Sequence, residues 1–166
     1  MSEPMNIRPG DVLLPETARQ PRADAQLTFV GVVRSTVETQ QTAPKNTSEA
    51  RSRRRPGTIE IAAAFRQGLV GLSAYSHIIV LGFLHEARRD LIQITRPGAT
   101  APTGLFALRS PVRPNPISLS VVRLSGVDVE RGLVEVDAID LLDGTPVIDI
   151  KPYRPSVDAV PDAIVP

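Results

Sequence analysis

The sequence predicts an all-β, β-rich fold, a small closed β-barrel with one or two short helices, in a single domain of 166 residues. Its 16 prolines are about twice the average usage, which disfavours long helices and favours short extended segments joined by rigid turns. Six or more apolar runs of strand length lie between turn signals, and barrel closure removes exposed strand edges. No G-x-G-x-x-G, P-loop or G-x-S-x-G motif is present, so Rossmann, P-loop and α/β-hydrolase folds are not expected.

Composition excludes several classes of function. The chain has no cysteine and two histidines, which excludes disulfides, thiolate metal sites and a cysteine nucleophile, and no metal site is predicted. No apolar run approaches the ~20 residues of a membrane helix, and residues 1–22 do not resemble a secretion signal. We therefore expect a cytoplasmic protein with no membrane contact. The net charge of +1 implies that any contact with nucleic acid is local.

The N-terminal third alternates between polar segments and one clear strand. Residues 1–26 are proline-punctuated and are predicted to form a flexible N-terminal arm. Leu27–Arg34 is predicted to be the first strand, with Gly31 marking a bulge or a close approach of another backbone. Ser35–Gly57 is predicted to be a long loop. It ends in arginines at positions 51, 53, 54 and 55, which either form a solvated surface or bind phosphate.

The middle of the chain carries the only helical spacing and the most apolar strand. Ala62–Leu72 is predicted to form one or two helical turns that end near Gly71. His77–Leu84 is continuously apolar, which predicts a strand buried on both faces. Arg88–Pro102 is predicted to be a polar connection. Further strands are predicted at Thr58–Ile61, Gly104–Arg109 and Ser118–Leu124.

Val134–Asp140 gives the clearest strand pattern, with apolar residues on one face and carboxylates on the other. Two adjacent apolar residues, Ala138 and Ile139, break this alternation and predict a bulge or strand end. An Asp-Gly turn then precedes a strand at Val147–Ile150. The predicted barrel domain spans residues 27–160, followed by a tail at 161–166.

The most informative segment is F-A-L-R-S-P-V-R-P-N-P-I-S-L-S-V-V-R-L, from Phe106 to Leu124. Two prolines flank Asn115, remove two backbone donors and fix two φ angles. Such a rigid turn can aim a side chain at a ligand. It can equally be no more than a stiff connection between strands.

This segment, together with D-L-L-D-G-T-P-V-I-D-I-K-P-Y from Asp140 to Tyr153, resembles the TsaA-like (TrmO) family of S-adenosylmethionine-dependent tRNA methyltransferases. The likeness begins at F-V-G-V-V-R-S from Phe29, includes L-S-A-Y-S-H from Leu72, and continues to about Ala159. It implies a homodimeric β-barrel that binds S-adenosylmethionine near the subunit contact. The implied activity is methyl transfer to N6 of threonylcarbamoyl-adenosine beside the anticodon of tRNA.

The resemblance also implies positions for the site. Arg113, Asn115 and Tyr153 are expected nearest the chemistry. The expected cofactor contacts are Pro44, Lys45, Asn46, His85, Glu86, Arg109, Leu119, Leu141, Leu142, Asp143 and Gly144.

Several of these positions depart from the family pattern or have simpler explanations. Lys45-Asn46 stands where the family usually shows Arg-Gln, Glu86 where glutamine is commoner, and Ser118 where glycine is usual. Asp143-Gly144 alone is more often a hairpin turn than a ligand site. Two other functions therefore stay open: an S-adenosylmethionine-binding module or small-molecule methyltransferase, and a structural dimer without a ligand.

Overall fold

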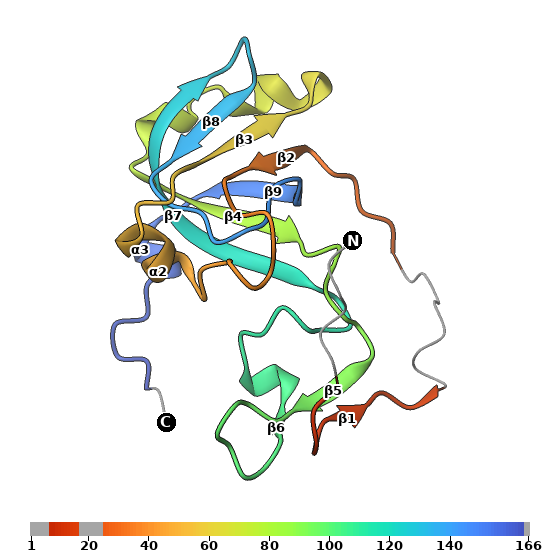
Figure 1. Cartoon of the computed structure of the whole chain (residues 1–166). Helices are drawn as coiled ribbons and strands as arrows, with labels where there is room; N and C mark the ends of the chain where they lie inside the picture. The colour runs from red at the N-terminus through yellow and green to blue at the C-terminus, as the bar shows by residue number, and fades with distance from the viewer. Residues whose placement is uncertain (1–6, 17–24, 165–166) are drawn as a thin grey trace.

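The computed structural model describes residues 7–16 and 25–164. Its main body is a closed barrel in which neighbouring strands are antiparallel (Figure 1). The strands in barrel order are β2 (Gly31–Arg34), β3 (Gly57–Ile61), β8 (Leu133–Val136), β7 (Ile117–Asp128), β4 (His77–Phe83) and β9 (Pro146–Pro152). The predicted fold class is confirmed.

The barrel interior is filled by the residues that the period of two places on one face of each strand. On β4, Ile78 and Val80 are fully buried, whereas Ile79 and Leu81 are half-buried. The prediction that β4 is buried on both faces was therefore wrong, because the described residues cover its outer face only in part. Gly31 allows β2 to approach β3 closely, since a Cβ at Gly31 would collide with the carbonyl oxygen of Glu60. This confirms the predicted close approach.

A three-stranded sheet lies beside the barrel, built from β1 (Val12–Leu13), β5 (Leu91–Ile94) and β6 (Thr103–Gly104) (Figure 1). The prediction of a strandless polar connection over 88–102 was wrong, because burial of Leu91 and a bond from the Thr95 amide to Asp11 Oδ1 (2.7 Å) stabilise β5. The strand predicted at 104–109 was also wrong. Its residues form the 3-10 helix η3 (Leu105–Ala107), which buries Leu105.

The helices are short. The segment predicted as a loop, residues 35–57, contains α2 (Thr47–Ser52), whose Ala50 is fully buried. The predicted turns after residue 62 are present as the 3-10 helices η1 (Ala63–Leu69) and η2 (Leu72–Ala74), and α3 (Pro155–Asp158) lies near the C-terminus.

Strand ends follow the sequence pattern in part. β8 ends at Val136, just before the predicted break at Ala138 and Ile139, whereas β7 is twelve residues long and extends well beyond its predicted end. Residues 1–6, 17–24 and 165–166 lie outside the described part, so the domain boundaries stay predictions. Within the described part, no helix is long and apolar enough to cross a membrane. No three metal-ligating side chains gather there either.

Candidate functional site

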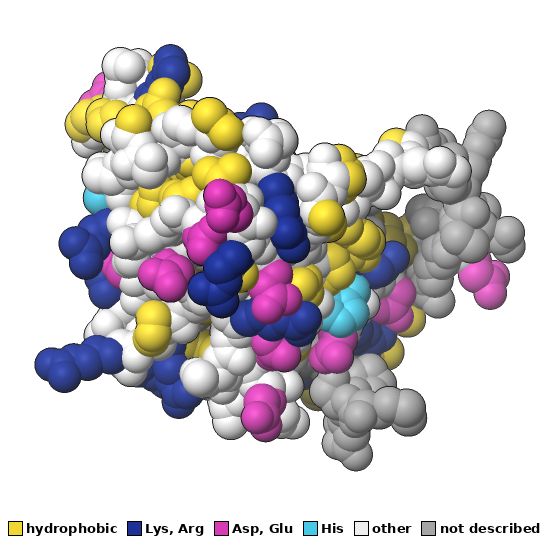
Figure 2. All heavy atoms as spheres, turned by 90° about the horizontal axis from the view of Figure 1, so that it is seen from above, with side chains coloured by type: hydrophobic (Ala, Val, Ile, Leu, Met, Phe, Trp, Pro, Cys, Tyr) yellow, Lys and Arg dark blue, Asp and Glu magenta, His cyan; other side chains and the backbone are white. Residues whose placement is uncertain are grey.

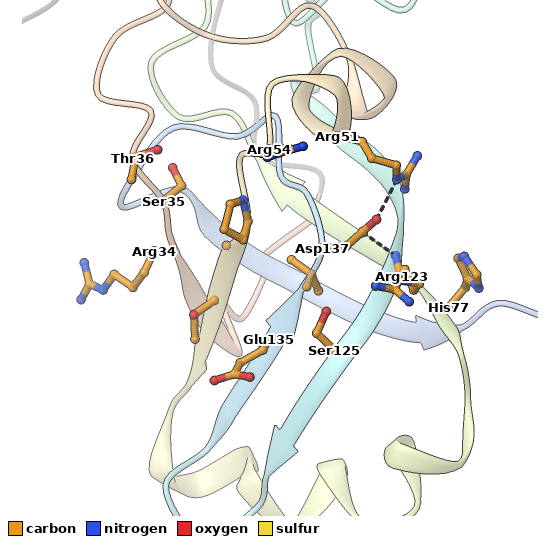
Figure 3. A pocket seen from close by; sticks show the side chains of 14 residues that line it. Arg34, Ser35, Thr36, Arg51, Arg54, His77, Arg123, Ser125, Glu135 and Asp137 are labelled. Atoms are coloured by element: carbon orange, nitrogen blue, oxygen red, sulfur yellow. Dashed lines mark hydrogen bonds and ion pairs between the residues drawn. The ribbon is translucent and has the colours of Figure 1, made fainter.

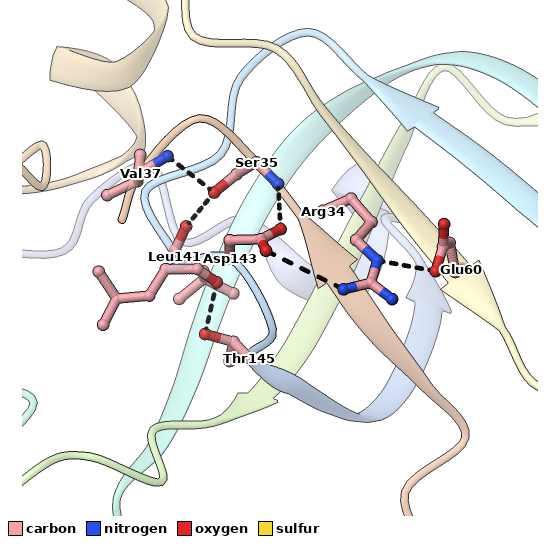
Figure 4. A network of polar contacts seen from close by, with 8 residues as sticks. Arg34, Ser35, Val37, Glu60, Leu141, Asp143 and Thr145 are labelled. Atoms are coloured by element: carbon pink, nitrogen blue, oxygen red, sulfur yellow. Dashed lines mark hydrogen bonds and ion pairs between the residues drawn. The ribbon is translucent and has the colours of Figure 1, made fainter. Parts of the chain in front are cut away.

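The D-G-T-P motif, residues 143–146, forms a loop that hydrogen bonds hold against the end of β2 (Figure 4). The Asp143 amide donates to the Val37 carbonyl (2.7 Å), and the Ser35 amide donates to Asp143 Oδ1 (3.1 Å). Ser35 Oγ donates to the Leu141 carbonyl (2.9 Å). The carboxyl of Asp143 stays 44% exposed, with Arg34 4.0 Å away. Both main-chain and side-chain bonds therefore set the shape of this loop and leave its carboxylate accessible.

The same loop closes one end of the barrel. A Cβ built on Gly82 of β4 would lie 2.7 Å from Ser118 Oγ, 3.1 Å from Leu141 Cδ1 and 3.4 Å from Thr145 Cγ2. Gly82 pairs with Ser118 of β7, and Ser118 Oγ accepts from the Gly82 amide (3.1 Å). The D-G-T-P loop and the first residues of β7 therefore meet at the end of β4, although the two motifs are more than twenty residues apart in the sequence.

The R-P-N-P turn, residues 113–116, lies at this end of β4 as well. The Leu84 amide donates to the Pro116 carbonyl (2.8 Å), so His85 and Asn115 lie beside the same junction, and both are exposed. Arg113 points back along the chain, where its Nη1 donates to the carbonyls of Leu105 (3.1 Å) and Leu108 (2.6 Å). Arg113 thus positions the segment before the turn in addition to any role in chemistry.

Arg109 and Leu119, two of the cofactor contacts that the family resemblance implies, contact each other. Arg109 Nη2 donates to the Leu119 carbonyl (3.2 Å), and Leu119 pairs with Leu81 on the outer face of the barrel. The Leu119 side chain is 48% exposed. It offers an apolar surface one residue from Ser118 and the junction with the D-G-T-P loop.

The Pro44–Asn46 segment precedes α2 and caps its first turn. Asn46 Oδ1 accepts from the Glu49 amide (2.9 Å), and Glu49 Oε2 accepts from the Lys45 amide (2.5 Å). This bond from Lys45, with further help from Arg53, lowers the pKa of Glu49. Pro44 is buried and Lys45 is exposed. Of these three residues, only Lys45 combines an exposed side chain with the absence of a side-chain hydrogen bond or ion pair to the described part of the chain.

Tyr153 does not join the other predicted residues within one chain. Its amide donates to the carbonyl of His77, the first residue of β4, whereas Asn115 lies beyond the last. Seven strand residues span roughly 20 Å at ~3.3 Å each. Arg113 and Asn115 therefore lie at one end of β4, and Tyr153 lies at the other. Residues Glu86 and Leu142 are placed at the same end as Asn115, in the turn after β4 and in the D-G-T-P loop.

Next to the D-G-T-P loop is a hollow of about 1090 Å³ that the site prediction did not include (Figure 3). Arg34 and Ser35 line its margin, so the hollow borders the network of Figure 4. Arg51 Nε donates to Asp137 Oδ2 (2.7 Å), and the Arg123 amide donates to Asp137 Oδ1 (2.9 Å). Burial alone would raise the pKa of Asp137, but these bonds and the two positive charges outweigh it and lower that pKa. The arginine run at 51–55 was the one sequence signal for this hollow. Arg123 gave none.

Positive and negative side chains are mixed on one face of the molecule. Figure 2 shows basic and acidic side chains interspersed on the face seen from above. This mixture agrees with the net charge of +1.

Comparisons with known proteins identify the family. Residues 32–159 match the family described as the tRNA-methyltransferase O N-terminal domain. The chain belongs to this family. The S-adenosyl-L-methionine-binding protein of Archaeoglobus fulgidus is 42% identical over 131 residues, which cover 79% of this chain and 91% of that protein.

Two longer relatives carry further detail. The tRNA (adenine(37)-N6)-methyltransferase of Escherichia coli is 35% identical over 83% of this chain and 61% of its own length. A crystal structure of TrmO from Pseudomonas aeruginosa superposes with a TM-score of 0.69 at 36% identity, over 88% of this chain and 62% of that one. The chain thus spans about three fifths of these two proteins and nearly all of the Archaeoglobus protein.

Proposed function

We propose that this chain is an S-adenosylmethionine-dependent methyltransferase that modifies N6 of adenosine 37 in tRNA, with threonylcarbamoyl-adenosine as the substrate nucleoside. The supporting observation is the meeting of the D-G-T-P loop and the R-P-N-P turn at one end of β4. This arrangement occurs in a chain 35% identical to the Escherichia coli enzyme. Because the proposed substrate is tRNA, we also propose that the protein acts in the cytoplasm.

The residues at this junction fit S-adenosylmethionine chemically. The cofactor carries a sulfonium cation, an amino acid end and an adenosine, and it supplies an electrophilic methyl group when bound. The exposed carboxylate of Asp143 suits its cationic groups, and the half-exposed side chain of Leu119 suits its apolar surface. The turn at Gly144 leaves space for a ligand, since a Cβ there would meet nothing within 4 Å.

The protein's main task is alignment. Direct transfer of a methyl group needs no covalent bond to the protein. Alignment of the N6 atom with the methyl group therefore supplies most of the acceleration. With the methyl group supplied by bound S-adenosylmethionine, the protein would need a group that accepts the proton leaving N6. His85, Glu86 and Asp143 are the candidates to accept it, since all three lie exposed at the junction. We expect Asn115, which is held between two prolines, to orient the adenine base of the substrate.

We also propose that the active form is a homodimer. The outer face of β4 and β7 carries apolar side chains that are not covered, including Ile117 (43% exposed) and Leu119 (48%). Phe29 (42% exposed) extends this surface by packing on Phe83, with ring centroids 5.4 Å apart. A second copy covering this face brings a second set of residues to the site. Sedimentation equilibrium should then give about twice 17.9 kDa.

The decisive experiment is mass analysis of nucleosides from tRNA incubated with the protein and S-adenosylmethionine. We expect one added methyl group on tRNA that carries the threonylcarbamoyl group and none on tRNA that lacks it. Asp143→Asn should weaken cofactor binding measured by calorimetry, whereas Asp128→Asn, in an exposed pair on the β7 to β8 hairpin, should not. Unchanged nucleosides at saturating cofactor would contradict the proposal.

A second candidate function is S-adenosylmethionine binding with a substrate other than tRNA. It is favoured by the match over 91% of the Archaeoglobus protein, whose name specifies cofactor binding alone. Cofactor binding by calorimetry without any affinity for tRNA would select this function over the first.

A further inference from the structure

The hollow beside the D-G-T-P loop collects positive charge from three separate segments of the chain. Arg34 comes from β2, Arg51 and Arg54 from α2 and the turn after it, and Arg123 from β7. Figure 3 shows Arg51, Arg54 and Arg123 along one side of the hollow, with His77 next to Arg123. These four arginines face two carboxylates, those of Glu135 and Asp137, so the hollow has an excess of positive charge.

The carboxylates do not neutralise every arginine. Arg51 is paired with Asp137, and Arg34 with Glu60 (2.8 Å). Within residues 7–16 and 25–164, the guanidinium groups of Arg54 and Arg123 make neither an ion pair nor a hydrogen bond. Arg123 hydrogen-bonds Asp137 only through its backbone amide (2.9 Å), and its side-chain charge acts on Asp137 without a direct contact. Two guanidinium groups in the open hollow are therefore available to a ligand.

The backbone at Arg54 supports a functional use of its side chain. Arg54 has φ of 52°, the only positive φ at a non-glycine residue in the described part of the chain. It follows the helix end, where the Arg55 amide bonds the Ala50 carbonyl (3.0 Å), and glycine is the preferred residue at such a position. An L-residue there costs stability, so an arginine is explained better by its side chain than by the turn.

The ligand chemistry follows from the lining groups. Arginine forks match the two oxygens of a phosphate, and hydroxyl groups such as those of Ser35, Thr36 and Ser125 can donate to phosphate oxygens. The hollow is open and elongated along β3, β8 and β7, without a buried pocket for a small molecule. Through Arg34 and Ser35 it is continuous with the loop that carries Asp143.

We propose that this hollow binds the sugar-phosphate backbone of RNA through Arg54 and Arg123, and guides the strand toward the junction at Asp143. The inference rests on the proposed tRNA substrate and names the surface that holds it. Because these contacts are electrostatic, they add affinity without sequence specificity.

The test uses Arg54→Gly and Arg123→Gln in the full chain, with Arg96→Gln as the matched control, because Arg96 is exposed and does not line the hollow. Affinity for unmodified tRNA is measured by fluorescence anisotropy over a series of salt concentrations. We expect each hollow variant to weaken binding roughly tenfold. Each should also reduce the slope of log K against log salt by about one. The control should change neither.

Folding and cofactor binding separate this role from a structural one. Arg54→Gly removes the strained φ, so its Tm should be unchanged or raised by up to about 4 °C. Its affinity for S-adenosylmethionine should equal that of the wild type. Equal tRNA affinity and equal salt slopes in the variants and the wild type would overturn the inference. Salt-dependent tRNA binding by the wild type that the variants lose, without any methylation, would retain the inference and reject the proposed activity.

Discussion

The barrel interior is held by apolar packing, whereas the loop layer over its end, residues 35–37 and 137–145, combines buried apolar side chains with directed hydrogen bonds. Interior residues such as Ile59, Ile78 and Val122 are completely buried and pack by shape and apolar surface. The loop layer uses directed hydrogen bonds from Ser35 and Asp143 and leaves a carboxylate exposed. Both regions therefore contribute apolar burial to stability, and the loop layer in addition holds an exposed carboxylate in a fixed position. Mutations in the two regions should separate these roles.

The largest expected effect is in the interior. Ile59→Ala removes a completely buried side chain of β3 and leaves a cavity, so the free energy of unfolding should fall by about 2–5 kcal/mol. Ile59→Val should cost only about 0.5–1.5 kcal/mol. Urea denaturation measures both. An equal loss for the two variants would show that the interior tolerates cavities and would weaken the contrast with the loop layer.

The boundary between the regions is the next target. Gly82→Ala places a methyl group 2.7 Å from Ser118 Oγ and 3.1 Å from Leu141 Cδ1, which should cost about 1–3 kcal/mol through overpacking. Adding Ser118→Gly removes the nearest contact, so the double variant should recover part of this loss. Thermal denaturation of the single and double variants tests this coupling. Additive losses would mean that the close contact is not the cause.

A smaller effect is expected at the start of α2. Asn46→Ala removes the side chain that caps this helix, and the free energy of unfolding should fall by about 1 kcal/mol. Asn46→Asp keeps an acceptor and should retain most of that stability. If Asn46→Ala instead lowers cofactor affinity at unchanged stability, the residue contacts the cofactor as the family resemblance implies.

The smallest effect concerns pH and the Asp137 carboxyl in the hollow. Its pKa is lowered in the folded chain, because bonds from Arg51 and the Arg123 amide outweigh its burial. Its stabilisation is therefore complete above the unfolded pKa of about 3.9 and is lost as pH falls through the folded pKa. Asp137→Asn should cost less than about 1 kcal/mol near pH 7. Urea midpoints should show this difference shrinking between about pH 5 and pH 2, and a constant difference would contradict the assignment.

Much of the barrel could be predicted, because the alternation of apolar and polar residues along a strand depends only on neighbouring positions. Val134 and Val136 face the interior and Glu135 faces outward, as the sequence pattern indicates. The sheet of β1, β5 and β6 could not be predicted in this way. Its strands are two to four residues long, and β1 pairs with a partner nearly eighty residues away. Local preferences carry little information when such distant contacts stabilise a strand.

By itself, the sequence determined the barrel class and the two motifs that carry the family resemblance, because residue alternation and proline-fixed turns act over a few neighbouring positions. Only the tertiary structure decided which motifs meet. It placed the D-G-T-P loop against Gly82 and Ser118, and put Tyr153 at the opposite end of β4 from Asn115. It also brought Arg123 beside the arginines of α2, since strand register and barrel closure join segments whose spacing along the chain gives no sign of contact.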